Sequence, residues 1–156
     1  MRILVVSQYF WPENFRINDV ALGLKEKGHS VSVLTGLPNY PEGKIHKGYS
    51  FFHKVQNYKG ISVYRSPLIP RGSGSSIRLF LNYISFAIFS CIKSLFIMKN
   101  KYDAIFVFEP SPITVVIPAI LIKKIKKIPI TLWVQDLWPE SIKAVNVNLP
   151  NLIIYF

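Results

Sequence analysis

Three short segments of the sequence combine polar, charged and proline residues, and each directly follows a run of apolar residues typical of a buried strand. The segments are 7–16, 109–112 and 135–140. In an open parallel sheet, ligands bind beyond the carboxyl ends of the strands, near the point where the strand order reverses. We therefore expect the three segments to meet in one cleft and to supply the side chains that bind and transform a ligand.

Familiar cofactor and catalytic signatures are missing from the sequence. No G-x-G-x-x-G follows the first apolar run, and the sequence has neither a Walker A loop nor a G-x-S-x-G elbow. A dinucleotide-dependent oxidoreductase is therefore disfavoured, although an unrelated Rossmann-like binder of NAD or ATP stays an alternative. His29, His46 and His53 lack the spacing of metal ligands, so we interpret them as structural or surface residues and expect no bound metal.

The charge balance points to an anionic partner. The 156-residue chain carries 19 Lys and Arg against 8 Asp and Glu, a formal net charge of +11. Such a balance favours nucleic acid, an anionic membrane surface or a phosphorylated substrate. Because the basic residues are dispersed over predicted loops and helix ends, we expect no nucleic-acid binding.

Short apolar runs alternate with longer helical patterns. This βαβ alternation predicts an α/β fold with a Rossmann-like, doubly wound and mostly parallel sheet. The first, fourth and fifth runs are nearly continuous in apolar residues, which is typical of central strands covered on both faces. The predicted strands are residues 3–6, 31–34, 61–64, 104–108 and 130–134.

Helix boundaries are marked by glycine, serine and proline. The first predicted helix ends at Gly28, because glycine accepts the left-handed backbone that follows many helices. A later helix begins at Ser111-Pro112 and is kinked at Pro118. The lysines of 123–127 close it, where positive charge suits the helix dipole.

Two segments of the sequence have no counterpart in a minimal nucleotide-binding fold. Residues 36–60 are long, aromatic and irregular, which predicts an ordered, functional loop. Residues 77–98 form a helix without a charged residue between 79 and 92, which is short for a bilayer span. We interpret this helix either as a buried core helix or as one that also dips an apolar edge into the membrane interface.

Three arginines surround the Gly/Ser-rich turn before that helix. Arg65, Arg71 and Arg78 can hold phosphates or lipid headgroups, and Arg71 and Arg78 are our predicted phosphate or membrane contacts. A solvated basic loop accounts for them equally well.

The cysteine content and the first residues indicate the cellular compartment, and the last residues indicate whether the protein continues into a further domain. Cys91, the one cysteine, permits no internal disulfide and fits a reducing compartment; we expect it to be buried. The first residues do not form a signal peptide, so we expect a cytoplasmic protein. The sequence ends on the apolar run 152–156, from which we expect the protein to continue into a further domain.

Three separated motifs, in this order, resemble the N-terminal domain of bacterial group-four glycosyltransferases. The motifs are VVSQYFWPE (5–13), LPNYPEG (37–43) and WVQDLWPES (133–141). Together they are most similar to the fucosamine-transferase type of surface-polysaccharide enzymes, and the resemblance covers essentially the whole chain. It implies that residues 1–156 are the acceptor-side half of a two-domain GT-B fold, whose C-terminal nucleotide-sugar domain is absent from this chain.

The resemblance also implies an activity. Such enzymes retain anomeric configuration and transfer a sugar from a nucleotide-sugar, commonly UDP-linked, to a lipid-diphosphate-linked glycan in surface polysaccharide, O-antigen or capsule biosynthesis. They bind no metal or other cofactor and work at the inner face of the cytoplasmic membrane. This chain alone is then expected to be inactive. The alternative is a non-catalytic, membrane-associated or partner-docking module.

Site residues follow from the motif positions. Gln135 and Asp136 lie where many relatives have a His-Asp pair; glutamine cannot shuttle a proton at neutral pH but can hydrogen-bond a sugar hydroxyl. Asp136 is therefore the candidate for an ionised role, unless it caps a helix. Glu109 is the candidate to orient an acceptor hydroxyl, unless backbone N–H groups bind it.

Phe15-Arg16 replaces a Gly-Gly pair that approaches donor phosphates in relatives, although Arg16 can contact a phosphate itself. The other predicted substrate-binding residues are Trp11, Asn14, Asn39, Tyr40, Ser111 and Glu140.

Overall fold

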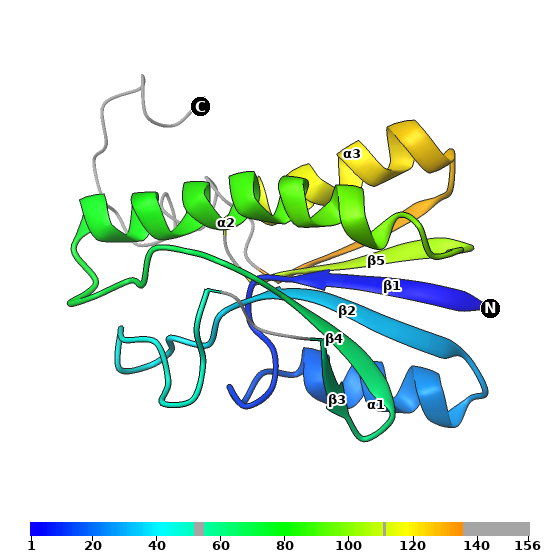
Figure 1. The fold of residues 1–156 in the computed structure, drawn as a ribbon, viewed down its shortest axis with the longest axis horizontal. Helices are drawn as coiled ribbons and strands as arrows, with labels where there is room; N and C mark the ends of the chain where they lie inside the picture. Colours follow the sequence, from blue (N-terminus) through cyan, green and yellow to red (C-terminus); the bar gives the residue numbers. More distant parts are fainter. Residues whose placement is uncertain (52–54, 111, 136–156) are drawn as a thin grey trace.

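The computed structural model describes residues 1–51, 55–110 and 112–135, which form one six-stranded sheet with helices on both faces (Figure 1). Its strand order is β3-β4-β2-β1-β5-β6, and every neighbouring pair is parallel except the antiparallel pair β3–β4. The expected α/β class with a mostly parallel sheet is confirmed, and it is compatible with a Rossmann-like fold. The strands are β1 (Arg2–Ser7), β2 (Ser30–Gly36), β3 (Gln56–Tyr58), β4 (Ile61–Ser66), β5 (Ala104–Glu109) and β6 (Ile130–Val134).

Helix α1 (Ile17–Glu26) covers one face of the sheet, while α2 (Ser76–Ile97) and α3 (Ile117–Lys126) cover the other (Figure 1). Alternate residues of a strand point to opposite faces, so β1 supplies both cores. Its Leu4 and Val6 pack with α2 and α3, and its Ile3 and Val5 pack with α1. Strand β1 lies between β2 and β5 and is therefore buried on both faces, as its continuous apolar run predicts.

Helix α1 ends just before Gly28, in agreement with the predicted helix end. Gly28 follows the helix with φ +82, and its N–H donates to the carbonyl of Lys25 at 2.9 Å. The next N–H, of His29, donates to the carbonyl of Leu24 at 3.2 Å. Glycine is favoured here because this backbone conformation strains any residue with a Cβ. The turn sends the chain directly into β2.

Several expectations need correction. Strand β6 is an edge strand of the described sheet rather than a central one, and its Leu132 and Val134 are 37% and 38% exposed. The segment 36–60 is not wholly irregular, because β3 lies within it and forms a hairpin with β4. Cys91 is half-buried rather than buried.

The predicted helix at 111–127 is also different in detail. A 3₁₀ turn, η1 (Ile113–Val116), leads into α3, and Pro118 lies in the first turn of α3. Proline is tolerated there because the first N–H groups of a helix have no partner within it. Lysines 123, 124 and 126 occupy the last turn, as predicted, and Lys127 follows with φ 54.

Candidate functional site

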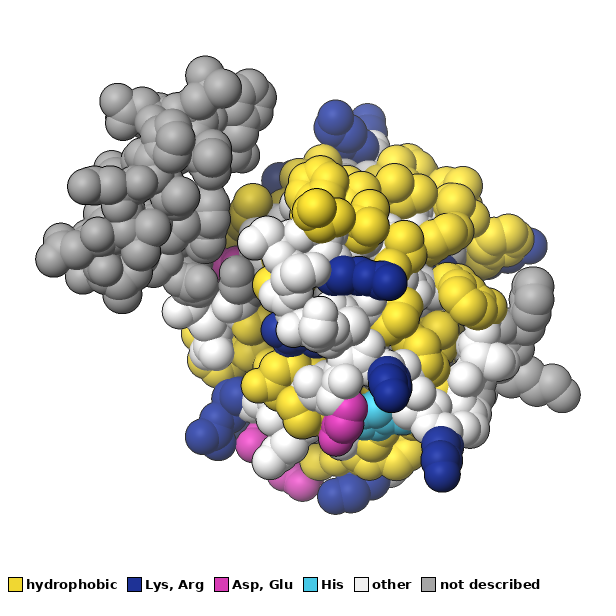
Figure 2. Space-filling model, turned by 90° about the vertical axis from the view of Figure 1, so that its left-hand side faces the viewer, with side chains coloured by type: hydrophobic (Ala, Val, Ile, Leu, Met, Phe, Trp, Pro, Cys, Tyr) yellow, Lys and Arg dark blue, Asp and Glu magenta, His cyan; other side chains and the backbone are white. Residues whose placement is uncertain are grey.

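The parallel strands end at one edge of the sheet, and Figure 2 looks onto that edge. The strand register places Ser7 of β1 beside Phe108 of β5, and Glu109 beside Val134 of β6. The N–H of Gln135 donates to the carbonyl of Glu109 at 2.9 Å. The described parts of all three predicted segments therefore lie along the same edge of the sheet.

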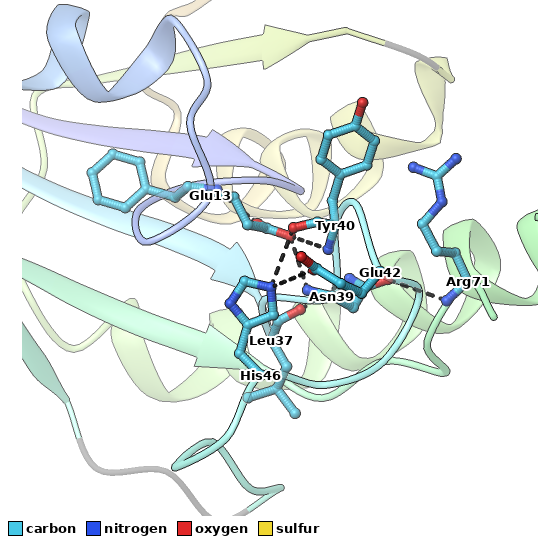
Figure 3. A network of polar contacts seen from close by, with 8 residues as sticks. Glu13, Leu37, Asn39, Tyr40, Glu42, His46 and Arg71 are labelled. Atoms are coloured by element: carbon cyan, nitrogen blue, oxygen red, sulfur yellow. Dashed lines mark hydrogen bonds and ion pairs between the residues drawn. The ribbon is translucent and has the colours of Figure 1, made fainter. Parts of the chain in front are cut away.

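A buried carboxylate organises the loop after β1. Glu13 is 3% exposed, and its Oε1 accepts hydrogen bonds from the N–H of Asn39 at 2.9 Å and of Tyr40 at 2.8 Å. Its Oε2 accepts a longer bond from the N–H of Phe10 at 3.4 Å. Figure 3 shows the carboxylate pointing at the backbone of Asn39 and Tyr40. Burial raises the pKa of Glu13, and the three N–H donors and the charge of Arg65 oppose that rise.

The side chain of Asn39 continues this network into the core. Asn39 is fully buried; its Nδ2 donates to the carbonyl of Leu37 at 3.1 Å, and its Oδ1 accepts from the N–H of Arg71 at 3.1 Å. Asn82 of α2 donates to the same oxygen at 3.4 Å and accepts from Nε2 of Gln8 at 2.6 Å. A direct contact between the Asn39 side chain and a substrate would require these bonds to break, so its observed role is to hold the loop.

A buried guanidinium interacts electrostatically with Glu13. Arg65 of β4 is 2% exposed, and it donates to Oε1 of Gln56 at 2.9 Å, to the carbonyl of Gly36 at 3.1 Å and to the carbonyl of Trp11. Burial lowers the pKa of Arg65 to about 10. Because these acceptors occupy its donors inside the protein, Arg65 is not the exposed phosphate ligand that the sequence allows.

Three aromatic side chains pack together in the loops at the same edge. Tyr9 stacks on Phe15 at 4.7 Å between ring centroids, and both rings contact Tyr40, at 5.9 Å and 5.3 Å. Tyr40 is 40% exposed, and the guanidinium of Arg71 lies 5.0 Å from its ring centroid. The structure thus brings together Tyr40 and Arg71, which the sequence places in separate loops.

The remaining predicted residues of the first segment are exposed. Trp11, which is 36% exposed, stacks on Tyr58 of β3 at 5.0 Å. Asn14 is exposed, and Arg16 precedes α1 and forms an exposed ion pair with Asp19 at 3.3 Å. This pairing leaves Arg16 on the surface beside the aromatic cluster.

At the far side of the edge, Glu109 is 2% exposed and Gln135 is exposed. Their backbone hydrogen bond fixes the end of β6 beside the end of β5. Ser111, Asp136 and Glu140 lie outside the described residues, so the structure does not place the catalytic candidate Asp136.

Two cations remain unneutralised near the Gly/Ser turn. Within the described ranges, Arg71 and Arg78 have no ion-pair partner. Arg78 is exposed in the first turn of α2, and Gly72 lies next to its side chain. Titratable side chains of the described residues form no group that could hold a metal ion, His29 and His46 included.

Two surface hollows lie away from this edge. An apolar groove of about 870 Å³ runs along α3 and β6, where Ile120, Ile130 and Leu132 line it with lysines at its rim. A polar hollow of about 430 Å³ lies near the opposite ends of the strands, with Ser32, Ser62 and Tyr64 among its residues. Neither hollow contains a predicted site residue.

Sequence reasoning missed the role of Glu13 and misplaced Arg65. The alternation Ile61, Val63, Arg65 puts the arginine on the buried face of β4, and this signal was available in the sequence. Glu13 gives no comparable signal, because its two closest N–H donors, Asn39 and Tyr40, lie 26 and 27 positions away.

A comparison with protein-family models gives no match, and a comparison with curated proteins gives no relative either. Function is therefore inferred from the residues themselves.

Proposed function

We propose that this chain is the acceptor-side domain of a retaining GT-B glycosyltransferase, a member of the group that its three motifs resemble. The enzyme would transfer a sugar from a nucleotide-sugar, most simply a UDP-sugar, to a lipid-diphosphate-linked glycan. The observation that carries the proposal is the meeting of the Trp11–Arg16 loop, the Tyr40–Arg71 pair, Glu109 and Gln135 at one strand edge. In sheets of this type, that edge binds the ligand.

The residues at this edge suit an anionic sugar conjugate. The partly exposed aromatic side chains of Trp11 and Tyr40 can pack against sugar rings, and Arg71 carries a charge suited to a diphosphate. Glu109 is assigned to the acceptor hydroxyl, Gln135 to a sugar hydroxyl, and Asp136, on its motif position alone, to the ionised role. The nucleotide would be held by a second domain, and no metal takes part in the proposed site.

A transfer assay tests this proposal. The chain is joined to its donor domain and supplied with UDP-sugars and a lipid-diphosphate acceptor. We expect Asp136→Ala and Glu109→Ala each to lower the rate by about 10²-fold or more, the usual cost of losing a general acid–base or positioning group. Asp103→Ala, at the opposite end of the strands, is the control and keeps the rate. If both site variants transferred sugar at the full rate, the proposed site would be wrong.

A second candidate function, peripheral binding to an anionic membrane, is favoured by one surface. Helix α2 is, within the described part of the chain, the one helix long and apolar enough to cross a membrane, yet only 39% of its most apolar window is buried. Its side chains Phe80, Ile88 and Phe96 are 63%, 54% and 63% exposed. Figure 2 shows apolar side chains gathered along the top of the molecule, over this helix.

The charge around this apolar surface suits an anionic bilayer. Residues 76–102 and 110–135 contain no Asp or Glu, while lysines at 93, 99, 101, 123, 124, 126 and 127 flank the apolar helices. Apolar side chains can enter the interface while the cations stay at the headgroups. For the proposed enzyme, this contact would bring the acceptor site to the inner face of the cytoplasmic membrane.

Vesicle flotation tests the membrane function. We expect the chain to float with anionic vesicles at low salt and to lose binding as salt rises. The double variant Phe80→Gln/Phe96→Gln should bind at least about tenfold more weakly, because each side chain contributes up to about 1.5–3 kcal/mol when buried in an apolar phase. Phe51→Gln, an exposed phenylalanine outside α2, is the control. Failure of the wild-type chain to float at low salt contradicts this function.

A further inference from the structure

The loop that carries Tyr40 is attached to the rest of the protein by backbone hydrogen bonds, in addition to the contacts of the Tyr40 ring with Tyr9 and Phe15. The carboxylate of Glu13 accepts the N–H groups of both Asn39 and Tyr40 through one oxygen, Oε1 (Figure 3). Because the two bonds fix consecutive peptide units, they set the direction in which the Tyr40 side chain leaves the backbone.

A second attachment joins this loop to the segment that carries Arg71. The N–H of Arg71 donates to Oδ1 of Asn39, and the N–H of Gly72 donates to the carbonyl of Gly43 at 2.9 Å. Asn39 therefore lies between Glu13 and Arg71, with its backbone N–H bound to one and its side-chain oxygen to the other. Both members of the Tyr40–Arg71 pair depend on the position of this one peptide.

The opposite end of Glu13 is fixed as well. The carbonyl of its own residue accepts from Nδ2 of Asn18 at 2.7 Å, and Oδ1 of Asn18 accepts from the N–H of Trp11 at 2.9 Å. Arg65 binds the carbonyl of Trp11. The loop after β1 thus has a defined shape of its own, and its buried carboxylate transmits that shape to the next loop.

We propose that Glu13 is a positioning residue of the acceptor site: its buried carboxylate fixes the Asn39–Tyr40 backbone and thereby sets where the Tyr40 ring and the Arg71 guanidinium meet a ligand. The identity of the ligand rests on the proposed function. The positioning of Tyr40 and Arg71 by Glu13 does not depend on it. Glu13 is itself buried and acts through Tyr40 and Arg71.

The test uses Glu13→Ala, Glu13→Gln and a control that loosens the core elsewhere. Glutamine keeps an oxygen that can accept the N–H groups of both Asn39 and Tyr40, so Glu13→Gln should retain most of the wild-type behaviour. Alanine leaves these two donors and the N–H of Phe10 without the acceptor. The control is Ile122→Ala, a fully buried residue of α3 on the other face of the sheet from α1. All variants are compared at a temperature at which near-ultraviolet circular dichroism shows them folded.

The first measurement needs no ligand. Nuclear Overhauser contacts between the Tyr40 ring and the Arg71 side chain should be lost in Glu13→Ala and kept in Glu13→Gln and Ile122→Ala. Amide hydrogen exchange at Asn39 and Tyr40 should quicken at least about tenfold in Glu13→Ala alone. Persistence of both the ring contacts and the exchange protection in Glu13→Ala overturns the inference.

The second measurement is the affinity for a soluble probe, a geranyl-diphosphate-linked N-acetylglucosamine. Misplacement of a binding group by about 1 Å can cost up to about 10²-fold, so we expect Glu13→Ala to bind about 10- to 100-fold more weakly and Glu13→Gln within a few-fold of wild type. Equal affinity of Glu13→Ala and wild type overturns the inference. A wild-type chain that does not bind the probe contradicts the proposed function instead, and the ring contacts still decide the role of Glu13.

Discussion

At the scale of single residues, the candidate site is built on two buried opposite charges that are satisfied largely by backbone groups. Glu13 accepts from peptide N–H groups, and Arg65 donates to the carbonyls of Gly36, the last residue of β2, and of Trp11 in the loop after β1. Burying a charge is costly unless it is hydrogen-bonded, so both residues stay where their partners hold them. This arrangement leaves Arg71 and Tyr40, rather than the buried pair, to meet a ligand.

The ionisation of Glu13 gives a prediction at this scale. Its folded pKa is raised above the ordinary value of 4.5, mainly by burial. A raised pKa means that the folded state binds more protons than the unfolded state above pH 4.5, so this group makes the protein less stable as pH rises through the folded pKa. We expect the free energy of unfolding of wild type, relative to Glu13→Gln, to fall by about 1.4 kcal/mol for each pH unit that separates the unfolded pKa from the folded pKa.

Urea unfolding from pH 4 to 8 measures this effect. Subtracting Glu13→Gln removes the titration of the groups that both proteins share. Arg65 and Tyr9, which interact electrostatically with the carboxylate, keep their charge states between pH 4 and 8 because the pKa of Arg65 is about 10 and burial raises the pKa of Tyr9 above its ordinary value. A difference that rises with pH would mean that the N–H donors outweigh burial and that the folded pKa of Glu13 is lowered.

At the scale of elements, the loops at the strand ends are held by close backbone contacts as well as by side chains. Gly43 has φ +74, and a Cβ placed on it would lie 1.8 Å from the carbonyl oxygen of Gly72. Gly48 has a similar φ of +85, but a Cβ there would meet nothing within 4 Å. The two glycines therefore separate backbone strain from steric exclusion in one loop.

We expect Gly48→Ala to lower the free energy of unfolding by about 1–2 kcal/mol, which is the strain of a left-handed backbone conformation in a residue with a Cβ. Gly43→Ala should lower the free energy of unfolding by at least about 1–2 kcal/mol more than Gly48→Ala, because the added methyl group forces the loops of Gly43 and Gly72 apart. Thermal or denaturant unfolding measures both changes. Equal destabilisation by the two substitutions would show that the Gly43–Gly72 approach contributes nothing beyond the φ angle.

Elements were predictable from the sequence where local chemistry decides them. The apolar run of β1 and the glycine that ends α1 both depend on neighbours in the chain, and both agree with the structure. The position of β6 at the edge of the described sheet does not follow from its apolar run, because exposure depends on strand order rather than on composition. Strand β3 was missed because three residues carry too little periodicity to be recognised.

At the scale of the whole molecule, the sheet separates two kinds of surface. The strand ends carry the polar and aromatic residues of the candidate site, while α2 and α3 present exposed apolar side chains with lysines around them. The polar and proline residues that follow the apolar runs predicted which segments meet at the strand ends, and the described parts of those segments lie there. These residues did not predict the pairing of Tyr40 with Arg71 or the burial of Asn39, because these depend on contacts between loops more than 30 positions apart.

The central claim, that the strand ends bind a sugar diphosphate, is tested most directly by mapping the binding of geranyl-diphosphate-linked N-acetylglucosamine on the ¹⁵N-labelled chain. Shift changes are expected at Trp11, Tyr40, Arg71, Glu109 and Gln135, and none at Ser30, Ser62 or Asp103 at the opposite strand ends. Substitution of Arg71 by glutamine should weaken the binding about tenfold, as expected for a charged hydrogen bond. Shift changes confined to the opposite strand ends or to the groove between α3 and β6, or no binding at all, would contradict the claim.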